Sequence, residues 1–276
     1  MCLAALAIDM HEDWPLIVIA NRDEFHTRPT AHMQPWRDAP GVLAGRDLLA
    51  GGTWLGVDGQ GRLALLTNVR DPKNTKSHAP SRGQLAERYL RGDLSAPDYL
   101  DSLVSQAPHY NGFNLIAIDA DQSAWHASNY QEPFRVPIQA GIHGLSNALL
   151  DTPWPKTRRT VAALADSLSS ASNAATFNPD LLCEIMLDTT PVEDSLLPST
   201  GIALPRERLL ATPFIVSPDY GTRCTTLVLR HQTGACWVQE DSYNPRGERV
   251  QRVRWRLQPG QQWQPTQHGP GNFNTD

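Results

Sequence analysis

Residues 1–24, MCLAALAIDMHEDWPLIVIANRDE, contain the pattern that decides the fold. Two short apolar runs, 3–8 and 15–20, flank a turn at 9–14. Both runs are apolar throughout, whereas a strand with one face in water alternates apolar and polar residues. The stretch therefore predicts a β-hairpin whose two strands are buried on both faces.

Further strands and helices follow in blocks along the chain. Asp58-Gly59 lies between two apolar runs and is a strong hairpin signal, and Ser81-Arg82-Gly83-Gln84 resembles a helix cap. We predict strands at 42–45, 53–57, 62–67, 113–118, 124–127, 142–146, 214–216, 224–229, 236–239 and 249–257, and helices at 85–90, 96–105, 156–168 and 179–187. Strands and helices grouped in blocks favour an α+β fold, with helices on the outer faces of sheets, over repeated βαβ units.

Composition excludes several classes of function. The net charge is −5 and no basic stripe is present, so nucleic acid is not an expected partner. The four cysteines lack zinc-ligand spacing, the nine histidines are dispersed, and no phosphate-binding loop occurs, so we expect no metal and no cofactor. No apolar run approaches the ~18 residues of a membrane span. We expect a cytoplasmic protein with one domain over 1–257 and a flexible Gln/Pro/Gly-rich tail over 258–276.

Cys2 is the first candidate for chemistry. An initiator methionine is commonly removed before a small residue, which would leave Cys2 with a free α-amine beside its thiol. Because an α-amine has an ordinary pKa of about 7.7–8.0 and a cysteine thiol one of about 8.5, the amine can act as base to its own side chain near neutral pH. The alternative is that Cys2 is an ordinary residue of a buried strand.

Four polar residues, Asn21, Arg22, Asp23 and Glu24, follow the second predicted strand directly. If the hairpin pairs, this segment lies beside Cys2, where Arg22 or Asp23 could hold the amine and the thiol in place. The alternative is a solvated loop with an internal ion pair.

Polar residues also mark the ends of later strands. Asn68 and Asn147 could donate hydrogen bonds to a developing oxyanion, since a side-chain amide does not change its protonation state. Arg223 could bind a carboxylate or polarise a carbonyl. Ordinary turn chemistry is the alternative for both asparagines. Trp54 could form an apolar wall of a pocket, or belong to the core.

Several blocks together resemble a known family. They are Met1-Cys2, ANRDEFHTRPT (20–30), GGTWLGVDGQGRLALLTN (51–68), SRGQL (81–85), GFNLIAID (112–119), HGLSNALLDTPWPK (143–156) and GTRCTTLVL (221–229). On these blocks the sequence is identified as a member of the NRDE family, also called the transport and Golgi organisation protein 2 family. The resemblance runs in order from residue 1 to about 257.

The resemblance implies a four-layer αββα sandwich of N-terminal-nucleophile hydrolase type with mostly antiparallel sheets. Such proteins are similar to penicillin V acylase and conjugated bile acid hydrolase, which cleave linear, non-peptide amides. By this resemblance the nucleophile is Cys2, and the other catalytic residues are Arg22, Asp23, Asn68, Asn147 and Arg223. We also expect Asn21, Glu24 and Trp54 to contact the substrate. Arg22 and Asp23 are adjacent here, whereas the acylases space their Arg and Asp further apart. Which of Asn21, Arg22, Asp23 and Glu24 faces Cys2 therefore stays open.

A second function also follows from the resemblance. Eukaryotic relatives are linked to secretory organisation and to haem or lipid handling. The alternative to an amidohydrolase is thus a non-catalytic haem or acyl-lipid binding protein on the same scaffold.

Overall fold

The predicted hairpin forms two interior strands of the first of two sheets in the computed structural model, which describes residues 2–170 and 177–270. Strand β1 (Cys2–Ile8) pairs antiparallel with β2 (Leu16–Phe25), and the ladder begins with Cys2 opposite Arg22. Residues 3–8 and 16–23 are all buried, as their uniform apolar character predicted for 3–8 and 16–20. The hairpin prediction is confirmed, but the buried strand continues into the polar residues Asn21, Arg22 and Asp23.

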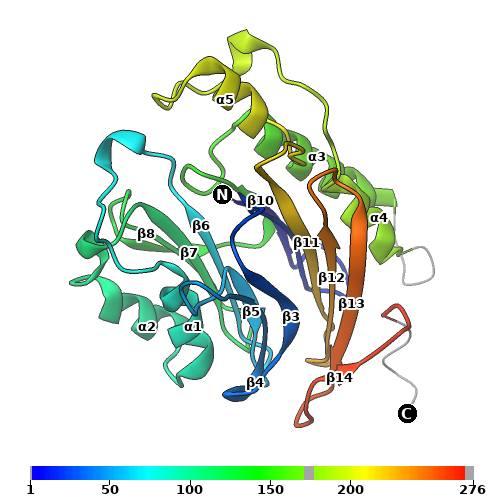
Figure 1. Cartoon of the computed structure of the whole chain (residues 1–276). Coiled ribbons are helices and arrows are strands. Elements are labelled where there is room, and N and C mark those ends of the chain that lie inside the picture. Colours follow the sequence, from blue (N-terminus) through cyan, green and yellow to red (C-terminus); the bar gives the residue numbers. More distant parts are fainter. Residues whose placement is uncertain (1, 171–176, 271–276) are drawn as a thin grey trace.

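The described strands form two antiparallel sheets (Figure 1). In spatial order, the first sheet contains β10 (Gly141–Leu145), β1, β2, β11 (Tyr220–Arg230), β12 (Cys236–Tyr243), β13 (Arg249–Leu257) and β14 (Gln264–Pro265). The second contains β3 (Thr30–Trp36), β4 (Ala39–Asp47), β5 (Leu55–Val57), β6 (Leu63–Asn68), β7 (Phe113–Ile118), β8 (Ala124–Ser128) and β9 (Arg135–Ile138). The helices are α1 (Gly83–Arg91), α2 (Ala96–Leu103), α3 (Pro155–Ser170), α4 (Pro179–Ile185) and α5 (Leu204–Leu210).

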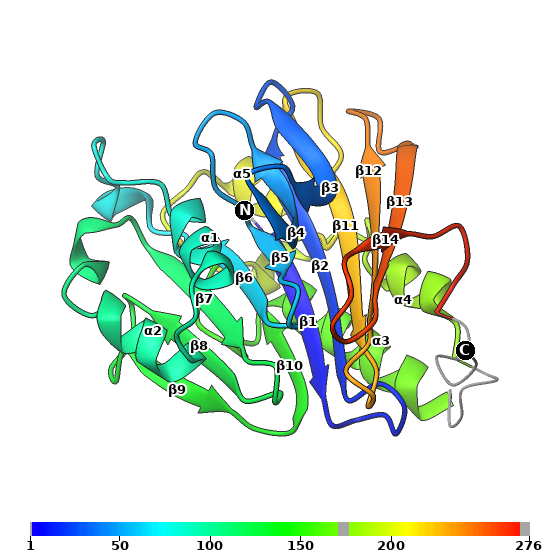
Figure 2. The ribbon, with the colours of Figure 1, turned by 90° about the horizontal axis from the view of Figure 1, so that it is seen from below.

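The two sheets pack face to face between two layers of helices (Figure 2). Alternation along β1 gives each sheet face its own core: Ala4 and Leu6 pack between the sheets, whereas Leu3 and Ala5 pack against α3 and α4. A third apolar cluster joins the second sheet to α1 and α2. The expected α+β, four-layer αββα architecture is therefore confirmed.

Four of the strands and helices named above were not predicted, namely β3, β9, β14 and α5, and one predicted strand does not form. Strand β3 and strand β9 lack continuous apolar runs, and α5 (LPRERLL) is short and mostly polar. The predicted strand at 214–216 is wrong, because Ile215 bonds locally to Thr222 through both its N–H and its carbonyl.

The flexible tail predicted from 258 onward differs from the structure over 258–270. Trp263 is buried and its Nε1 donates to the carbonyl of Gly41 at 3.0 Å, while β14 pairs with β13. The segment is rich in Gln and Pro, so its composition did not indicate burial. The indole of Trp263 provides the apolar surface that packs against the rest of the chain. The rest of the predicted tail, 271–276, and the expected removal of Met1 lie outside the described residues. Among the described helices, none combines the length and the apolar character that crossing a membrane requires.

Candidate active site

Cys2 lines a cavity of about 570 Å³ where the ends of β1, β2 and β6 meet. We call it the Cys2 cavity. The carbonyl of Cys2 accepts a hydrogen bond from Ser146 Oγ at 3.1 Å, which fixes the start of β1 against the end of β10. Burial raises the pKa of the Cys2 thiol, while the positive charges of the N-terminus and of Arg22 act in the opposite direction. A thiol with a raised pKa needs a base before it can attack a substrate.

Arg22 is the residue of the NRDE segment that faces Cys2. The two residues are opposite each other in the β1–β2 ladder and so point to the same side of the sheet. The Arg22 guanidinium lies 4.2 Å from the centre of the Trp54 ring and donates to Thr30 Oγ1 at 3.1 Å. Both Arg22 and Trp54 line the Cys2 cavity.

Asn21 lies on the other side of the sheet. Its Nδ2 donates to the backbone carbonyls of Met186 and Pro213 at 2.8 and 3.0 Å. Its Oδ1 accepts from Thr225 Oγ1 at 2.6 Å. The structure therefore does not bring Asn21 to the cavity, because the two-residue period of β2 turns it toward the helical layer. Asn21 joins the sheet to the segments around α4.

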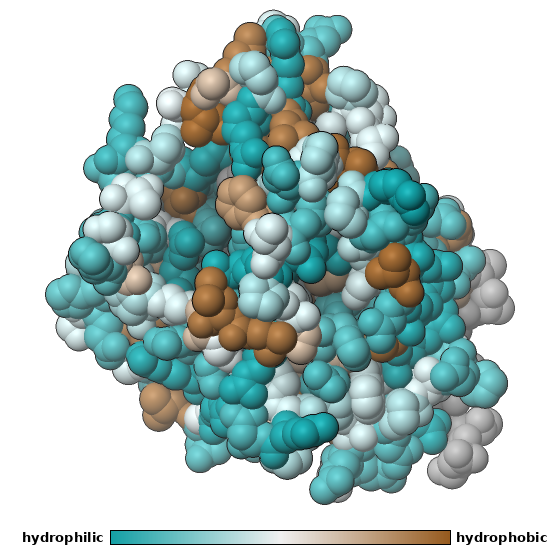
Figure 3. All heavy atoms as spheres, in the orientation of Figure 1, coloured by the Kyte–Doolittle hydropathy of each residue, from teal (hydrophilic) through white to brown (hydrophobic). Residues whose placement is uncertain are grey.

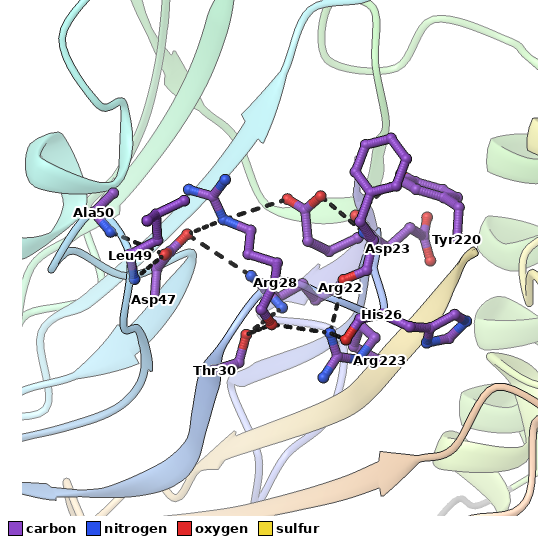
Figure 4. A network of polar contacts seen from close by, with 12 residues as sticks. Arg22, Asp23, His26, Arg28, Thr30, Asp47, Leu49, Ala50, Tyr220 and Arg223 are labelled. Carbon is purple, nitrogen blue, oxygen red and sulfur yellow. Dashed lines mark hydrogen bonds and ion pairs between the residues drawn. The ribbon is translucent and has the colours of Figure 1, made fainter.

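Asp23 is buried at the end of β2, with 1% of its surface exposed. The Thr222 hydroxyl donates to its Oδ1 at 2.7 Å. The Tyr220 hydroxyl donates to its backbone carbonyl at 3.0 Å (Figure 4). Burial raises the pKa of the Asp23 carboxyl, and the positive charge of Lys156 is the main influence that lowers it. The carboxyl is thus held rigidly, within electrostatic reach of Cys2.

Lys156 is a buried cation that sequence reasoning missed. It is the second residue of α3, with 1% of its surface exposed, and its Nζ has no hydrogen-bond partner among the described residues. Burial lowers its pKa to about 8, against the opposing influence of Asp23. The block HGLSNALLDTPWPK contains this lysine, but no pattern in it marks a lysine that would be buried.

The two candidate asparagines meet where the sheets join. Asn147 Nδ2 donates to the backbone carbonyl of Asn68 at 3.0 Å, and the backbone N–H of Arg70 donates to the carbonyl of Asn147 at 2.8 Å. Ser146 links this pair to Cys2. Asn68 lines the Cys2 cavity, whereas Asn147 is buried behind it. One Asn147 N–H is already used within the protein, so Asn68 is the better placed of the two to donate to a ligand.

Arg223 and Glu24 occupy different positions relative to the cavity. Arg223 Nη1 donates to the backbone carbonyls of Phe25, His26 and Arg28, and so holds the turn after β2 (Figure 4). It is the unpaired residue of a β-bulge in β11 opposite β2, and it does not line the Cys2 cavity. Glu24 does line it.

Two further arginines in the cavity wall were not predicted. Arg28 Nε binds Asp47 at 2.7 Å, and both residues line the cavity (Figure 4). Arg82 precedes α1 and was interpreted as part of a helix cap, but the first turn of α1 has no side-chain cap. Its Nη1 instead donates to the carbonyl of Gly112 at 3.0 Å, and the side chain lines the cavity. Arg28 lies in RPT (28–30) and Arg82 in SRG (81–83). Both stretches belong to the blocks that carry the family resemblance, so those blocks could have marked the two arginines as candidates.

No group of three or more His, Cys, Asp and Glu side chains over 2–170 and 177–270 is arranged to hold a metal ion.

The floor of the cavity depends on a close backbone contact, which gives a first prediction. A Cβ on Gly52 would overlap the carbonyl of Gly83 and lie 2.7 Å from the N of Gln84 at the start of α1. We expect Gly52→Ala to lower the free energy of unfolding by about 2 kcal/mol, because backbone atoms have little room to move. Urea unfolding would measure it.

The neighbouring Gly51 is the matched control. It has a φ of +85° and nothing within 4 Å of an added Cβ, so Gly51→Ala adds only backbone strain, about 1 kcal/mol. A Gly52→Ala variant no less stable than Gly51→Ala would show that the contact with Gly83 relaxes easily.

Comparison with known sequences now assigns the family. Residues 1–245 match the sequence profile described as Transport and Golgi organisation 2. The chain belongs to this family. The mouse Transport and Golgi organization 2 homolog is 33% identical over 241 residues, covering 82% of this chain and 86% of the relative. The human homolog is 34% identical over the same shares of both chains. The resemblance inferred from the sequence blocks is confirmed.

A solved structure supports the fold of this Transport and Golgi organisation 2 family member. The chain is similar to a mutant of conjugated bile acid hydrolase from Clostridium perfringens, with a TM-score of 0.50 over 98% of this chain and 97% of that one. The two are 8% identical, so the likeness concerns the fold alone. The N-terminal-nucleophile hydrolase fold expected from the sequence is confirmed.

Proposed function

We propose that the chain is an N-terminal cysteine hydrolase that cleaves a linear, non-peptide C–N amide bond. The observation that carries the proposal is the position of Cys2, which is the first residue of a central strand and lines a cavity together with Arg22, Asp23 and Asn68. Removal of Met1 would place a free α-amine at the same point.

In the proposed reaction the α-amine of Cys2 accepts the thiol proton and the sulfur attacks the amide carbonyl carbon. The C–N bond then breaks, the amine product leaves with the proton, and a thioester to Cys2 remains. Water hydrolyses the thioester, releasing the acid and restoring the thiol. Asn68, assisted by Asn147, would donate to the oxyanion formed at each attack.

The buried charges give Asp23 and Lys156 positioning roles in this proposal. An ionised Asp23 carboxyl near the α-amine would orient it toward the thiol. The positive charge of Lys156 opposes the effect of burial on the pKa of Asp23 and so favours the ionised carboxyl. Arg22, stacked on Trp54, would orient the substrate carbonyl or the thiolate.

The cavity wall favours a polar amide over haem or an acyl-lipid. Three arginines and three carboxyl residues line it: Arg22, Arg28, Arg82, Asp23, Glu24 and Asp47. The face of the molecule in Figure 3 is mostly hydrophilic, and its hydrophobic residues gather only in small separate groups. A long apolar ligand would remove these charged groups from water and offer them no polar contact of its own, which is unfavourable.

The test is the intact mass of the purified chain before and after brief treatment with iodoacetamide at about pH 7.5, below the ordinary thiol pKa, followed by peptide mapping. We expect loss of Met1 and labelling of Cys2 alone. Burial raises the pKa of Cys183 and of Cys236 to about 12, and Cys224 is buried as well, so these three thiols serve as internal controls. A retained Met1, or a Cys2 that labels no faster than the other three, would contradict the proposal and direct the next titrations to haem and acyl-lipids.

A further inference from the structure

A second, smaller cavity adjoins the Cys2 cavity. It has a volume of about 250 Å³ and shares two wall residues with the Cys2 cavity, Asn68 and Arg82. Arg70 and Arg206 complete a set of three arginines in its wall, so we call it the arginine cavity. The two cavities therefore border each other at Asn68 and Arg82.

The cations of the arginine cavity are mostly not neutralised by the protein. Arg82 and Arg206 have no carboxylate within ion-pair distance among the described residues: Arg82 donates to the carbonyl of Gly112, and Arg206 lies 4.7 Å from the centre of the Tyr220 ring. By contrast, the Cys2 cavity pairs Arg28 with Asp47 at 2.7 Å. The positive charge available to a ligand thus lies mainly on Arg82, which the two cavities share, and on Arg206 in the arginine cavity.

Arg70 adds a buried guanidinium to this set. Its side chain is 5% exposed, and its Nη1 binds Glu207 at 2.7 Å. Its Nε and Nη2 are buried without a hydrogen-bond partner in the described part of the chain. Buried guanidinium N–H groups are normally satisfied, so two open donors beside a cavity indicate a polar ligand. The Trp154 ring, 4.9 Å from the guanidinium carbon, fixes its position.

The carboxylate in the wall does not offset these charges. Asp71 Oδ2 accepts hydrogen bonds from Asn74 Nδ2 at 2.6 Å and from the Tyr130 hydroxyl at 2.7 Å. The carboxylate is therefore already engaged by Asn74 and Tyr130. The remaining wall is largely apolar, and is formed by Val69, Pro72, Ile202 and Leu210. Such a site suits an anionic group on a short apolar stem.

We propose that the arginine cavity binds an anionic group (carboxylate, sulfonate or phosphate) of the substrate whose amide lies at Cys2. The inference rests on the proposed function for the position of the amide, and it narrows the substrates to acidic amides. Asn68 lies at the junction, where it can contact the reacting carbonyl, while Arg82 and Arg206 hold the charged end. Guanidinium groups suit all three anions because their N–H donors match paired oxygens.

The experiment compares the rates at which Cys2 is labelled by maleimidoalkanoic acids of increasing chain length and by their methyl esters, which lack the charge. We expect one chain length of the acid to react about tenfold faster than its ester, as a charge-assisted contact predicts. Arg206→Gln should remove most of this preference and leave the rate of the ester unchanged, and Arg206→Lys should restore part of it. Arg256→Gln, which changes an exposed arginine on β13, should have no effect.

Two results would overturn the inference: equal rates for acid and ester at every chain length, or a preference that survives Arg206→Gln. If Cys2 reacts with none of the maleimides, the proposed function is wrong. The anion site can still be tested by measuring how inorganic phosphate changes the Tm. A rise in the Tm of the full chain with phosphate that Arg206→Gln abolishes and Arg256→Gln retains would then support it. A Tm that phosphate changes equally in all three proteins would refute it.

Discussion

Cys2→Ala will abolish amide hydrolysis by the purified chain, lowering kcat by about 10⁴-fold or more, and will leave its folding almost unchanged. The loss is large because the thiol is the atom that forms the proposed thioester, and removal of a nucleophile eliminates that route. The effect on stability is small because Cys2 is only partly buried at the end of a strand whose core contacts begin at Leu3. Single-turnover hydrolysis of an acidic amide and urea unfolding measure the two effects.

The matched control is a variant with one extra residue before Cys2, chosen so that it is not removed with the initiator methionine. This variant keeps the thiol but blocks its α-amine, so a mechanism in which the amine is the base predicts a loss of kcat close to that of Cys2→Ala. A blocked variant with full activity would show that another group deprotonates the thiol. Haem or acyl-lipid binding that persists in Cys2→Ala, in the absence of any hydrolysis, would support the binding-protein alternative.

Much of the fold follows from sequence because its central strands are apolar on both faces. The runs 3–8 and 15–20 identify β1 and most of β2, and the Asp58-Gly59 turn joins β5 to β6. β3 could not be found in this way, since its burial is irregular and it contains Pro35. The packing of Trp263 on Gly41 depends on residues far apart in sequence, so composition alone predicted a tail there.

The candidate site was predictable where it coincides with strand geometry. The hairpin register places the NRDE segment next to Cys2, and the two-residue period then separates Arg22 from Asn21. Arg223 could not be placed from sequence, because the bulge in β11 changes the direction of the strand beside it. Lys156 could not be found either. Its burial depends on how α3 packs against the end of β1, which no local pattern encodes.

Lys156→Met should change how stability depends on pH, and this is the second large effect that we expect. The pKa of Lys156 is about 8 in the folded chain and near 10.5 when the lysine is exposed to water. Between these values the unfolded chain binds the proton and the folded chain does not, so the contribution of Lys156 to stability rises with pH across this window. Below pH 8 the cost of burying the charged lysine is fully present, at about 3 kcal/mol.

Methionine has a similar shape and no charge, so it removes this pH-dependent contribution. The free energy of unfolding of Lys156→Met, relative to that of the unmodified chain, should therefore fall by about 3 kcal/mol between pH 8 and 10.5. Buried thiols and tyrosines also titrate at alkaline pH, but they are present in both proteins and cancel in the difference. Urea unfolding at several pH values measures it, with Lys73→Met, at an exposed lysine, as the control that should show no trend.

The same substitution tests the role of Lys156 beside Asp23. Without the cation, the pKa of the Asp23 carboxyl rises further, because burial acts on it with less opposition. The acid side of the pH–kcat profile should then move to higher pH, while KM for the amide changes little. A profile that keeps its shape although the stability difference follows the expected trend would separate the two roles: Lys156 would be a buried charge that the fold tolerates, and Asp23 would not be the group that orients the amine.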